Sequence, residues 1–431
     1  MTAEAVNAAS MVLKKEMKML VQGSEPQTTL GLDDINLGDP DFWLRDDFYG
    51  ALALLRKERP ISWHEHPEAG KGFWALLDHE DISEVDKDWE AFSSKYGVRV
   101  YHDAGTKVRP GTGALIELDP PNHTVNRKRV SKAFTPRQVG SLEGSVREHA
   151  RRLVSQLSEG QEIDFVDDLA AILPFEIICD LVGVDPADRS HLLKLSTIGR
   201  SEHEPEYVDK PEIPQQAVNE LREYGVNLAA KRLLDPKEDL ISELAQVQVD
   251  GKPIDKEELG GYFGLMISAG SGTTRSALSH GMLAFTQFPD QRRLFISDPM
   301  GLERTMAEEV IRWATPLKHQ GRVLTRDIDF KGVQMKKGQK ISMWFVAANR
   351  DPSLFTDPFK FDITREINLH QSFGAGGPHF CMGAHIARRE IWVLFQELFA
   401  RFPNAEVIAD PVRERSLQSN GFKNMKVRLS R

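Results

Sequence analysis

The chain has 431 residues, of which 40% are hydrophobic and 28% are charged, a balance typical of a globular protein. Its formal net charge of −9 argues against wholesale nucleic-acid binding, although it leaves room for a local basic patch. Two cysteines are too few for a disulfide framework, so the composition indicates a protein of the reducing cytosol.

The chain begins with a polar lead-in over residues 1–30, which we expect to be flexible. Charges interrupt this segment early, and no run of about 18 apolar residues occurs later in the chain. We therefore expect neither a signal peptide nor a membrane anchor. Residues 31–431 contain no internal repeat and no interdomain linker, which predicts a single domain.

Helical spacing dominates the middle of the chain. Residues 61–81 predict two short strands around a Gly/Pro turn, and residues 121–320 carry apolar residues mainly at helical spacing. Within that region, the Pro- and Glu-rich segment 201–216 predicts a long loop between helices. Cys179 lies in an apolar helical stretch, where a small buried side chain is expected.

The C-terminal part returns to strands and then to one more helix. Residues 323–352 alternate and turn at Lys331-Gly332 and at Lys337-Gly338, which predicts a strand meander. A helix is expected after Cys381 through about residue 401, followed by short strands. The predicted fold class is mainly α with small β-sheets, that is, α+β.

Cys381 lies in the glycine-rich stretch FGAGGPHFCMGAHIAR, residues 373–388, directly before this last helix. Helix N–H groups stabilise a thiolate, and glycines let a large flat group approach the backbone. Such an arrangement suits a cysteine that is the axial ligand of haem iron. Two alternatives are an inert core thiol and a nucleophile with His379 as its base, although no third group is evident to orient that pair.

The stretch resembles the haem-binding loop of the cytochrome P-450 family, Phe-x-x-Gly-x-(Arg/His)-x-Cys-x-Gly. Phe373 departs from the pattern, because it precedes the cysteine by eight residues instead of seven. A similar longer loop occurs in bacterial members that act on sterol side chains and branched lipids. The resemblance implies a helical bundle enclosing haem b, with Cys381 as the iron ligand. It also implies that other loop residues lie against the haem, namely Phe373, Gly376, His379 and Gly383.

A second stretch, residues 264–281, is apolar and rich in small residues, as in a tightly packed kinked helix or a helix that passes over a cofactor. Its segment Ala269-Gly270-Ser271-Gly272-Thr273-Thr274 resembles the family's oxygen-binding motif, (Ala/Gly)-Gly-x-(Asp/Glu)-Thr-Thr. The resemblance implies that Ala269 and Gly270 border the haem and that Thr273 hydrogen-bonds bound oxygen. Gly272 replaces the family's acid, so protons must be relayed through water, Ser271 or another group, or peroxide is used directly.

Two further sets of residues resemble family positions. Glu309 and Arg312 lie three residues apart on one helix face and, with Arg365, resemble the family's buried structural network; an ordinary surface ion pair is the alternative. The second set resembles the donors to the haem propionates, whereas a solvated basic helix face is the alternative for its first two members. That set comprises His123, Arg127, Arg322 and His379.

The resemblance places the substrate pocket among mostly apolar residues, so an apolar substrate is expected: a steroid, a terpenoid or a branched fatty acyl chain. The implied pocket residues are Val98, Met266, Ile267, Ala269, Leu317 and Phe422. Lys318 and His319 could anchor an oxygen or a carboxylate at the far end of the pocket, although an orientation toward solvent is favoured.

The function expected from the resemblance is that of a haem-thiolate monooxygenase that inserts one atom of O₂ into its substrate. The chain carries no glycine fingerprint for FAD or NAD, so electrons are expected from a separate ferredoxin and its reductase. The resemblance gives this ferredoxin a basic docking face, for which solvated helix charges are the alternative. Its expected members are Arg127, Lys128, Arg129, Lys132, Arg137, Arg388 and Arg389.

Three other functions are weighed against this one. A peroxygenase driven by H₂O₂, or an atypical oxidation, is suggested by Gly272 alone. A non-enzymatic haem sensor lacks a recognisable signalling segment, and a zinc or thiol hydrolase lacks ligand spacing. A monomeric enzyme of the bacterial cytosol is expected.

Overall fold

The computed structural model describes residues 25–66, 72–100, 115–249 and 252–431. The predicted flexible lead-in falls largely outside these residues, and the single domain predicted over residues 31–431 stays a prediction. The helices are α2 (Phe48–Glu58), α3 (His79–Lys87), α4 (Asn122–Val130), α5 (Pro136–Ser155), α6 (Ile172–Val182), α7 (Arg189–Ile198), α8 (Glu212–Leu234), α9 (Leu240–Ala245), α10 (Lys256–Gln287), α11 (Pro289–Ser297), α12 (Glu303–Ala314), α13 (Phe345–Ala348) and α14 (Ala384–Arg401). Short 3-10 or π segments are η1 (Leu32–Asp34), η2 (Pro40–Leu44), η4 (Leu115–Glu117), η5 (Ser131–Phe134), η6 (Val166–Ala170) and η7 (Pro186–Asp188).

The largest sheet has five strands in the order β1-β2-β10-β7-β3, in which only β2 and β10 pair in parallel. Its strands are β1 (Ile61–His64), β2 (Phe73–Leu76), β3 (Phe92–Ser93), β7 (Gln320–Leu324) and β10 (Lys340–Met343). A second sheet joins β11 (Glu406–Val407), β14 (Lys426–Arg428) and β4 (Glu162–Asp164). The remaining pairs are β5 (Gln248–Val249) with β6 (Lys252–Pro253), β8 (Ile328–Phe330) with β9 (Val333–Met335), and β12 (Val412–Arg413) with β13 (Phe422–Asn424).

The helix-rich α+β fold class is confirmed, and most elements lie where the sequence predicts them. The strands around residues 61–76, the meander and the helix after Cys381 are all present. Lys331 and Gly332 have φ values of 52° and 86°, which is the left-handed backbone that turns β8 into β9. The loop predicted over residues 201–216 is too long, because α8 already begins at Glu212. Pro214 lies in the first turn of that helix, where a missing N–H is tolerated.

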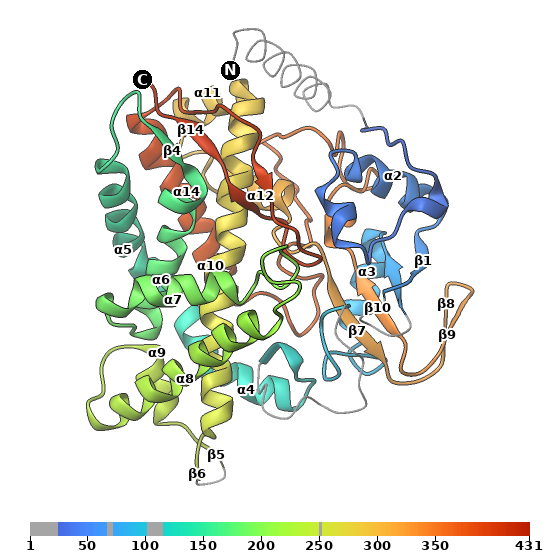
Figure 1. The fold of residues 1–431 in the computed structure, drawn as a ribbon, viewed down its shortest axis with the longest axis horizontal. Coiled ribbons are helices and arrows are strands. Elements are labelled where there is room, and N and C mark those ends of the chain that lie inside the picture. Colours follow the sequence, from blue (N-terminus) through green and yellow to red (C-terminus); the bar gives the residue numbers. More distant parts are fainter. Residues whose placement is uncertain (1–24, 67–71, 101–114, 250–251) are drawn as a thin grey trace.

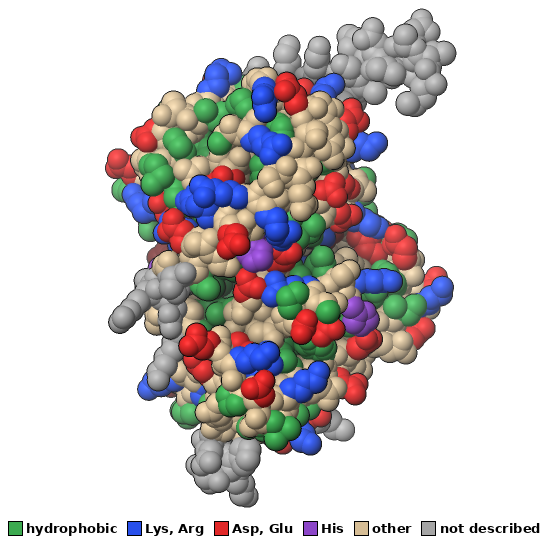
Figure 2. All heavy atoms as spheres, turned by 90° about the vertical axis from the view of Figure 1, so that its left-hand side faces the viewer, with side chains coloured by type: hydrophobic (Ala, Val, Ile, Leu, Met, Phe, Trp, Pro, Cys, Tyr) green, Lys and Arg blue, Asp and Glu red, His purple; other side chains and the backbone are tan. Residues whose placement is uncertain are grey.

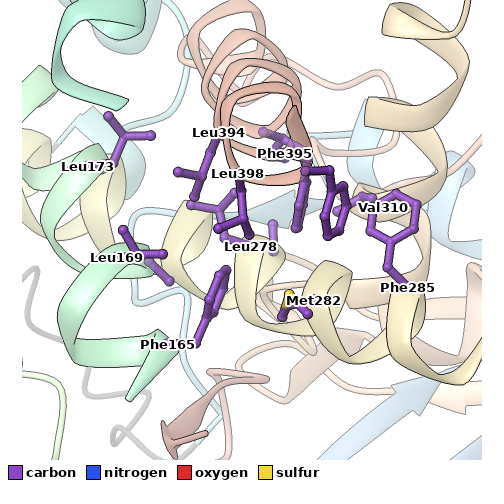
Figure 3. Packing of buried hydrophobic residues seen from close by; sticks show 14 of the residues in the cluster. Phe165, Leu169, Leu173, Leu278, Met282, Phe285, Val310, Leu394, Phe395 and Leu398 are labelled. Carbon is purple, nitrogen blue, oxygen red and sulfur yellow. The ribbon is translucent and has the colours of Figure 1, made fainter. Parts of the chain in front are cut away.

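The long helix α10 runs through the helical part of the molecule. The five-stranded sheet lies on the side of the molecule opposite α5 (Figure 1). Apolar side chains from several helices pack around the second half of α10, as Figure 3 shows. The labelled residues are Phe165, Leu169, Leu173, Leu278, Met282, Phe285, Val310, Leu394, Phe395 and Leu398. A Cβ at Gly281 would lie 2.8 Å from the Phe395 ring, so a small residue there lets α10 and α14 approach closely.

Among the residues that the structure describes, no helix is both long and apolar enough to cross a membrane.

A fully buried ion pair ties α12 to the segment before the cysteine loop. Arg312 Nη2 lies 2.7 Å from Glu309 Oε1, and both side chains are 0% exposed. Arg312 also donates to the carbonyls of Asn349 and Pro358, and Arg365 Nε lies 3.4 Å from Glu309 Oε2. The alternative of an ordinary surface ion pair is therefore wrong, since water reaches neither partner. The pair fixes geometry because removing one member would leave the other charged and buried.

We expect Glu309→Gln to destabilise the protein by about 3–5 kcal/mol, since it leaves Arg312 without its buried counter-ion. Asp290→Asn is the matched control, because Asp290 pairs with Arg293 at the same i,i+3 spacing but on the surface. The control should hardly move the denaturation midpoint. Equal midpoints for the two variants in urea titrations would contradict the structural role of Glu309.

Candidate functional site

Hydrogen bonds and close backbone packing fix the conformation of the loop that leads to Cys381. The Cys381 N–H donates to the carbonyl of Phe373 at 2.8 Å, which closes the loop on itself. Gly374 and Gly376 have φ values of 101° and 97°, a backbone conformation that favours glycine. At Gly377 a Cβ would overlap the carbonyl oxygen of Asp86, so only glycine allows this approach.

Asp86 anchors the same loop through its carboxylate. Its Oδ2 accepts the N–H groups of Ala375 and Gly377 at 2.9 and 3.0 Å, and its Oδ1 lies 2.9 Å from Arg322 Nη2. One buried carboxylate therefore joins α3, strand β7 and the cysteine loop.

The sulfur of Cys381 lies at the start of α14 and lines a large internal cavity. Burial raises the pKa of its thiol, while the backbone N–H groups of Gly383 and Ala384 and the charges of Arg127 and Arg388 act in the opposite direction. The donors are thus in place for a thiolate, and a bound metal ion would supply the remaining stabilisation.

One end of this cavity gathers the predicted propionate donors. His123, Arg127, Arg322 and His379 all line it, and the rings of His123 and His379 lie 4.3 Å apart between centroids. His379 Nε2 lies 3.1 Å from Ser94 Oγ, and Arg127 donates to the carbonyl of Phe380. Cationic and neutral donors from α4, β7 and the cysteine loop therefore converge where a group with two carboxylates would be held.

The surroundings of His123 show whether a group with two carboxylates would fit at this end of the cavity. Its side chain is 1% exposed, and neither ring nitrogen has a hydrogen-bond partner. Burial lowers its pKa to about 4, with Arg127 contributing in the same direction. A buried donor without an acceptor is costly, so a carboxylate at this end of the cavity would satisfy it.

The rest of the cavity lining is mostly apolar. Such a lining is typical of small-molecule sites generally. Cys381, Phe373 and Gly383 line one part, and Ala269, Gly270, Thr273 and Thr274 of α10 line another. The donor set and the shape together fit a haem held between the cysteine loop and α10.

Thr273 presents a hydroxyl to this cavity from an uninterrupted helix. Its Oγ1 donates to the carbonyl of Ala269 at 2.8 Å, and Ser271 donates likewise to Ile267 at 2.7 Å. Each hydroxyl thus bonds a carbonyl one turn back within α10, which runs from Lys256 to Gln287. Ser271 is buried and does not line the cavity, whereas Thr273 and Thr274 do.

The position of the missing acid is occupied by a cation. A Cβ at Gly272 would overlap Nη1 of Arg200, whose side chain extends from the turn after α7 over α10. Burial lowers the pKa of Arg200 to about 10, so it stays charged at neutral pH. Gly272 therefore makes room for a guanidinium, and a proton relay through this side of α10 meets a positive charge.

Several predicted pocket residues lie elsewhere. Met266, Ala269 and Leu317 line the cavity, but Val98, Ile267 and Phe422 do not. Ile267 and Phe422 are packed into the apolar core, and the Val98 carbonyl accepts the Gly321 N–H at 2.7 Å. Gly376 also lies outside the lining, where it serves the turn of the loop.

Lys318 and His319 were expected to face solvent, and this expectation is wrong. They are 2% and 0% exposed, and Lys318 Nζ donates to the carbonyls of Ser416 and Ser419 at 2.6 and 2.5 Å. His319 Nδ1 lies 3.2 Å from the carbonyl of Leu417. Both residues hold the C-terminal turn and do not line the cavity.

Sequence reasoning also missed much of the lining. The additional apolar residues come from η4, η5, α6, α10 and α13, and their signal is only the apolar face of each element. They include Leu115, Ile116, Phe134, Ile177, Ile178, Leu181, Leu265 and Phe345. One buried carboxyl in the lining, Glu390, carries no sequence signal at all.

The expected basic docking face is largely neutralised by partners. Arg129 pairs with Glu258 at 2.7 Å, Arg388 with Glu308 at 2.8 Å, and Arg389 with Glu303 at 2.7 Å and Glu143 at 3.2 Å. Lys128 is exposed, whereas the side chains of Lys132 and Arg137 lie outside the described part of the chain. Figure 2 shows basic and acidic side chains interspersed on the face that carries α5.

Comparison with known proteins agrees with this geometry. Residues 299–421 match the family model described as Cytochrome P450. The methyl-branched lipid omega-hydroxylase of Mycobacterium tuberculosis is 37% identical over 97% of this chain and 100% of its own length. The steroid C26-monooxygenase of Rhodococcus jostii is 36% identical over 94% and 86%, respectively. Among solved structures, Mycobacterium marinum cytochrome P450 CYP268A2 in complex with pseudoionone gives a TM-score of 0.85 at 32% identity, covering 94% of this chain and 99% of that one.

The contact between Gly272 and Arg200 predicts a strong coupling between the two positions. In Gly272→Asp the new carboxylate would displace the flexible guanidinium and pair with it. We expect a double-mutant cycle with Arg200→Leu to give a coupling of about 0.5–3 kcal/mol in urea unfolding. Gly272→Asn, which adds the same volume without a charge, should show a much smaller coupling. Additive effects in both cycles would contradict the proximity.

The orphaned His123 predicts a pH dependence of stability. Its folded-state pKa is about 4, below the ordinary value of 6.5, so its contribution is present above pH 6.5 and is lost as the pH falls toward 4. In haem-free protein His123→Phe should remove about 3 kcal/mol of that acid-dependent loss. The effect should shrink when haem carboxylates are bound. Parallel stability curves for the variant and the natural chain between pH 7 and 4 would sink this prediction.

Proposed function

Because the chain belongs to the cytochrome P450 family and is a monooxygenase of that family, we propose that it hydroxylates the end of an apolar, branched lipid or steroid side chain. The observation that carries the proposal is the mostly apolar cavity that both Cys381 and Thr273 line. Two relatives support the substrate class, since their names specify oxidation at the end of a methyl-branched lipid and at C26 of a steroid.

The cofactor is haem, and we propose haem b. Cys381 would hold its iron, and His123, Arg127, Arg322 and His379 would receive its propionates. The haem supplies the oxygen-activating chemistry when bound. The chain orients it through the donors at one end of the cavity and keeps water away through the apolar lining. Thr273 has a hydroxyl that can both accept and donate a proton within the cavity.

Electrons are proposed to come from a ferredoxin. The docking face has fewer free charges than the sequence suggested, because Arg129, Arg388 and Arg389 are paired. Electrostatic steering of the ferredoxin should therefore be weaker than an unpaired basic cluster would give. Lys128 is an exposed member of this face. Assembly as a monomer and a place in the bacterial cytosol stay expectations from the sequence.

A peroxygenase is the second candidate, favoured by the guanidinium that stands where the family has an acid. Turnover with H₂O₂ that exceeds turnover with ferredoxin and its reductase would decide for it.

We expect branched fatty acids or steroids with a side chain to shift the haem spectrum and to yield a product hydroxylated at the chain end. Mass spectrometry of the products locates the oxygen. The two cysteines provide a matched control: Cys381→Ser should abolish the thiolate-type spectrum of the reduced carbon monoxide complex, whereas Cys179→Ala should retain it. Cys179 is buried in the core, where burial raises its pKa to about 12. Oxidation of a ring or of an interior carbon alone would contradict the proposed position.

A further inference from the structure

Arg388 makes a contact with the cysteine loop that the docking role expected from the sequence does not explain. This residue lies on α14, and its guanidinium carbon is 4.6 Å from the centre of the Phe373 ring. The carbonyl of Phe373 in turn accepts the N–H of Cys381 at 2.8 Å. A positive charge therefore lies against the ring of the residue that is hydrogen-bonded to the cysteine backbone.

Glu308 of α12 keeps the guanidinium in this place. Its Oε1 lies 2.8 Å from Arg388 Nε, and its Oε2 lies 2.8 Å from Nε2 of His370, in the segment before the loop. Because the Nδ1 of His370 accepts the N–H of Ser372 at 3.3 Å, Nε2 is the ring nitrogen that donates to Glu308. Both oxygens of the carboxylate are thus engaged, which gives Arg388 a defined position.

These three side chains form a clamp on Phe373, which we call the Phe373 clamp: Arg388, Glu308 and His370. The side chains of His370, Glu308 and Arg388 are 3%, 17% and 27% exposed, respectively. The ring of His370 lies 5.6 Å from that of Phe373 between centroids, so Phe373 lies close to both the imidazole and the guanidinium. Solvent screens partly buried charges less than it screens surface charges, so the clamp can act on its surroundings.

The neighbouring arginine shows that this placement is not a general property of α14. The side chain of Arg389 is 25% exposed, nearly the same as that of Arg388, and it pairs at 2.7 Å with another acid of α12, Glu303. Its guanidinium carbon lies 5.1 Å from the ring centre of Trp392, which does not line the cavity, whereas Phe373 does. The two arginines therefore share a helix, an exposure and a kind of partner, and they differ in the ring that they cover.

The charge of Arg388 favours negative charge on the sulfur of Cys381. Burial raises the pKa of the Cys381 thiol, while the charges of Arg127 and Arg388 act in the opposite direction. Arg127 is one of the expected propionate donors, so of these two cations Arg388 is the one with no proposed part in holding the haem. An electron added to a cysteine-ligated haem brings further negative charge next to the sulfur, and a nearby cation stabilises that charge.

We propose that Arg388, held on Phe373 by Glu308 and His370, sets the reduction potential of the haem that Cys381 binds. The proposal rests on the proposed ligation of haem by Cys381. In the step concerned, one electron leaves the ferredoxin and reduces the ferric iron to the ferrous state. The guanidinium stabilises the reduced state and so raises the potential, while the opposite charge of Glu308 limits this effect. Arg388 and Glu308 are positioning residues, since they act through the electrostatic field at the cysteine loop.

The test is a potentiometric titration of the haem-loaded protein with chemical mediators, which needs neither ferredoxin nor substrate. Arg388→Met removes the charge and retains a long side chain, Arg388→Lys retains the charge, and Glu308→Gln removes the opposite charge. Arg389→Met and Glu303→Gln are the matched controls, since this pair joins the same two helices. Each variant is first checked for the thiolate-type spectrum of its reduced carbon monoxide complex, so a failure of the proposed ligation by Cys381 is recognised separately.

We expect Arg388→Met to lower the equilibrium constant for one-electron reduction about fivefold, because a partly buried positive charge is lost. At about 59 mV per tenfold change for one electron, this is a fall of about 40 mV. Glu308→Gln should raise the constant by a similar factor, since the charge that opposes Arg388 is removed. Arg388→Lys and the two controls should stay within about twofold of the natural chain, because the charge near Phe373 is retained in all three.

Equal potentials for Arg388→Met and Arg389→Met would overturn the proposal. So would shifts of the same sign in Arg388→Met and Glu308→Gln, because a loosened loop that admits water would move both variants alike, whereas the loss of opposite charges moves them apart. If Arg388→Met does not bind haem, Glu308→Gln decides: a potential above that of Glu303→Gln supports the proposal, and an equal or lower one overturns it.

Discussion

The carboxylate of Asp86 is the contact on which the site depends. It accepts two backbone N–H groups of the cysteine loop and pairs with Arg322 on β7, so three segments far apart in sequence share one anchor. Because the glycines leave the loop little side-chain packing of its own, this anchor and the N–H bond from Cys381 to Phe373 fix the sulfur at the head of α14. The position of the sulfur in turn sets which residues of α10 it faces across the cavity.

Charge is distributed around the cavity in a consistent way. Cations and histidines collect at the end where His123 has no acceptor, and the remaining wall is mostly apolar. A ligand with two carboxylates and a flat apolar body would satisfy both regions at once. Burial also raises the pKa of Glu390 to about 8 against an opposing hydrogen bond with Thr274, while the neighbouring Arg388 and Arg389 pair with other acids.

The sequence was sufficient for the helix-rich fold, the cysteine loop and the central helix, because glycine spacing and helical periodicity are local signals. The same reasoning placed His123, Arg127, Arg322 and His379 together only through a family resemblance. It failed where a side chain is oriented by distant segments. Lys318 and His319 look like surface residues in sequence but are covered by the turn at 416–419. Neither Arg200 over Gly272 nor Glu390 beside Thr274 could be predicted, since each contact joins segments far apart in the sequence.

The C-terminal turn is bound to the segment that precedes β7. Lys318 is bound to it through Ser416 and Ser419, Asn420 N–H donates to the Pro316 carbonyl at 2.9 Å, and Leu317 bridges to Ser419. Pro316 and Leu317 are the residues of this contact that line the cavity. Substitutions at residues 416–420 therefore change the shape of the cavity without contacting the ligand. The preference for one substrate chain length over another thus depends in part on the C-terminal segment, remote from the reacting centre.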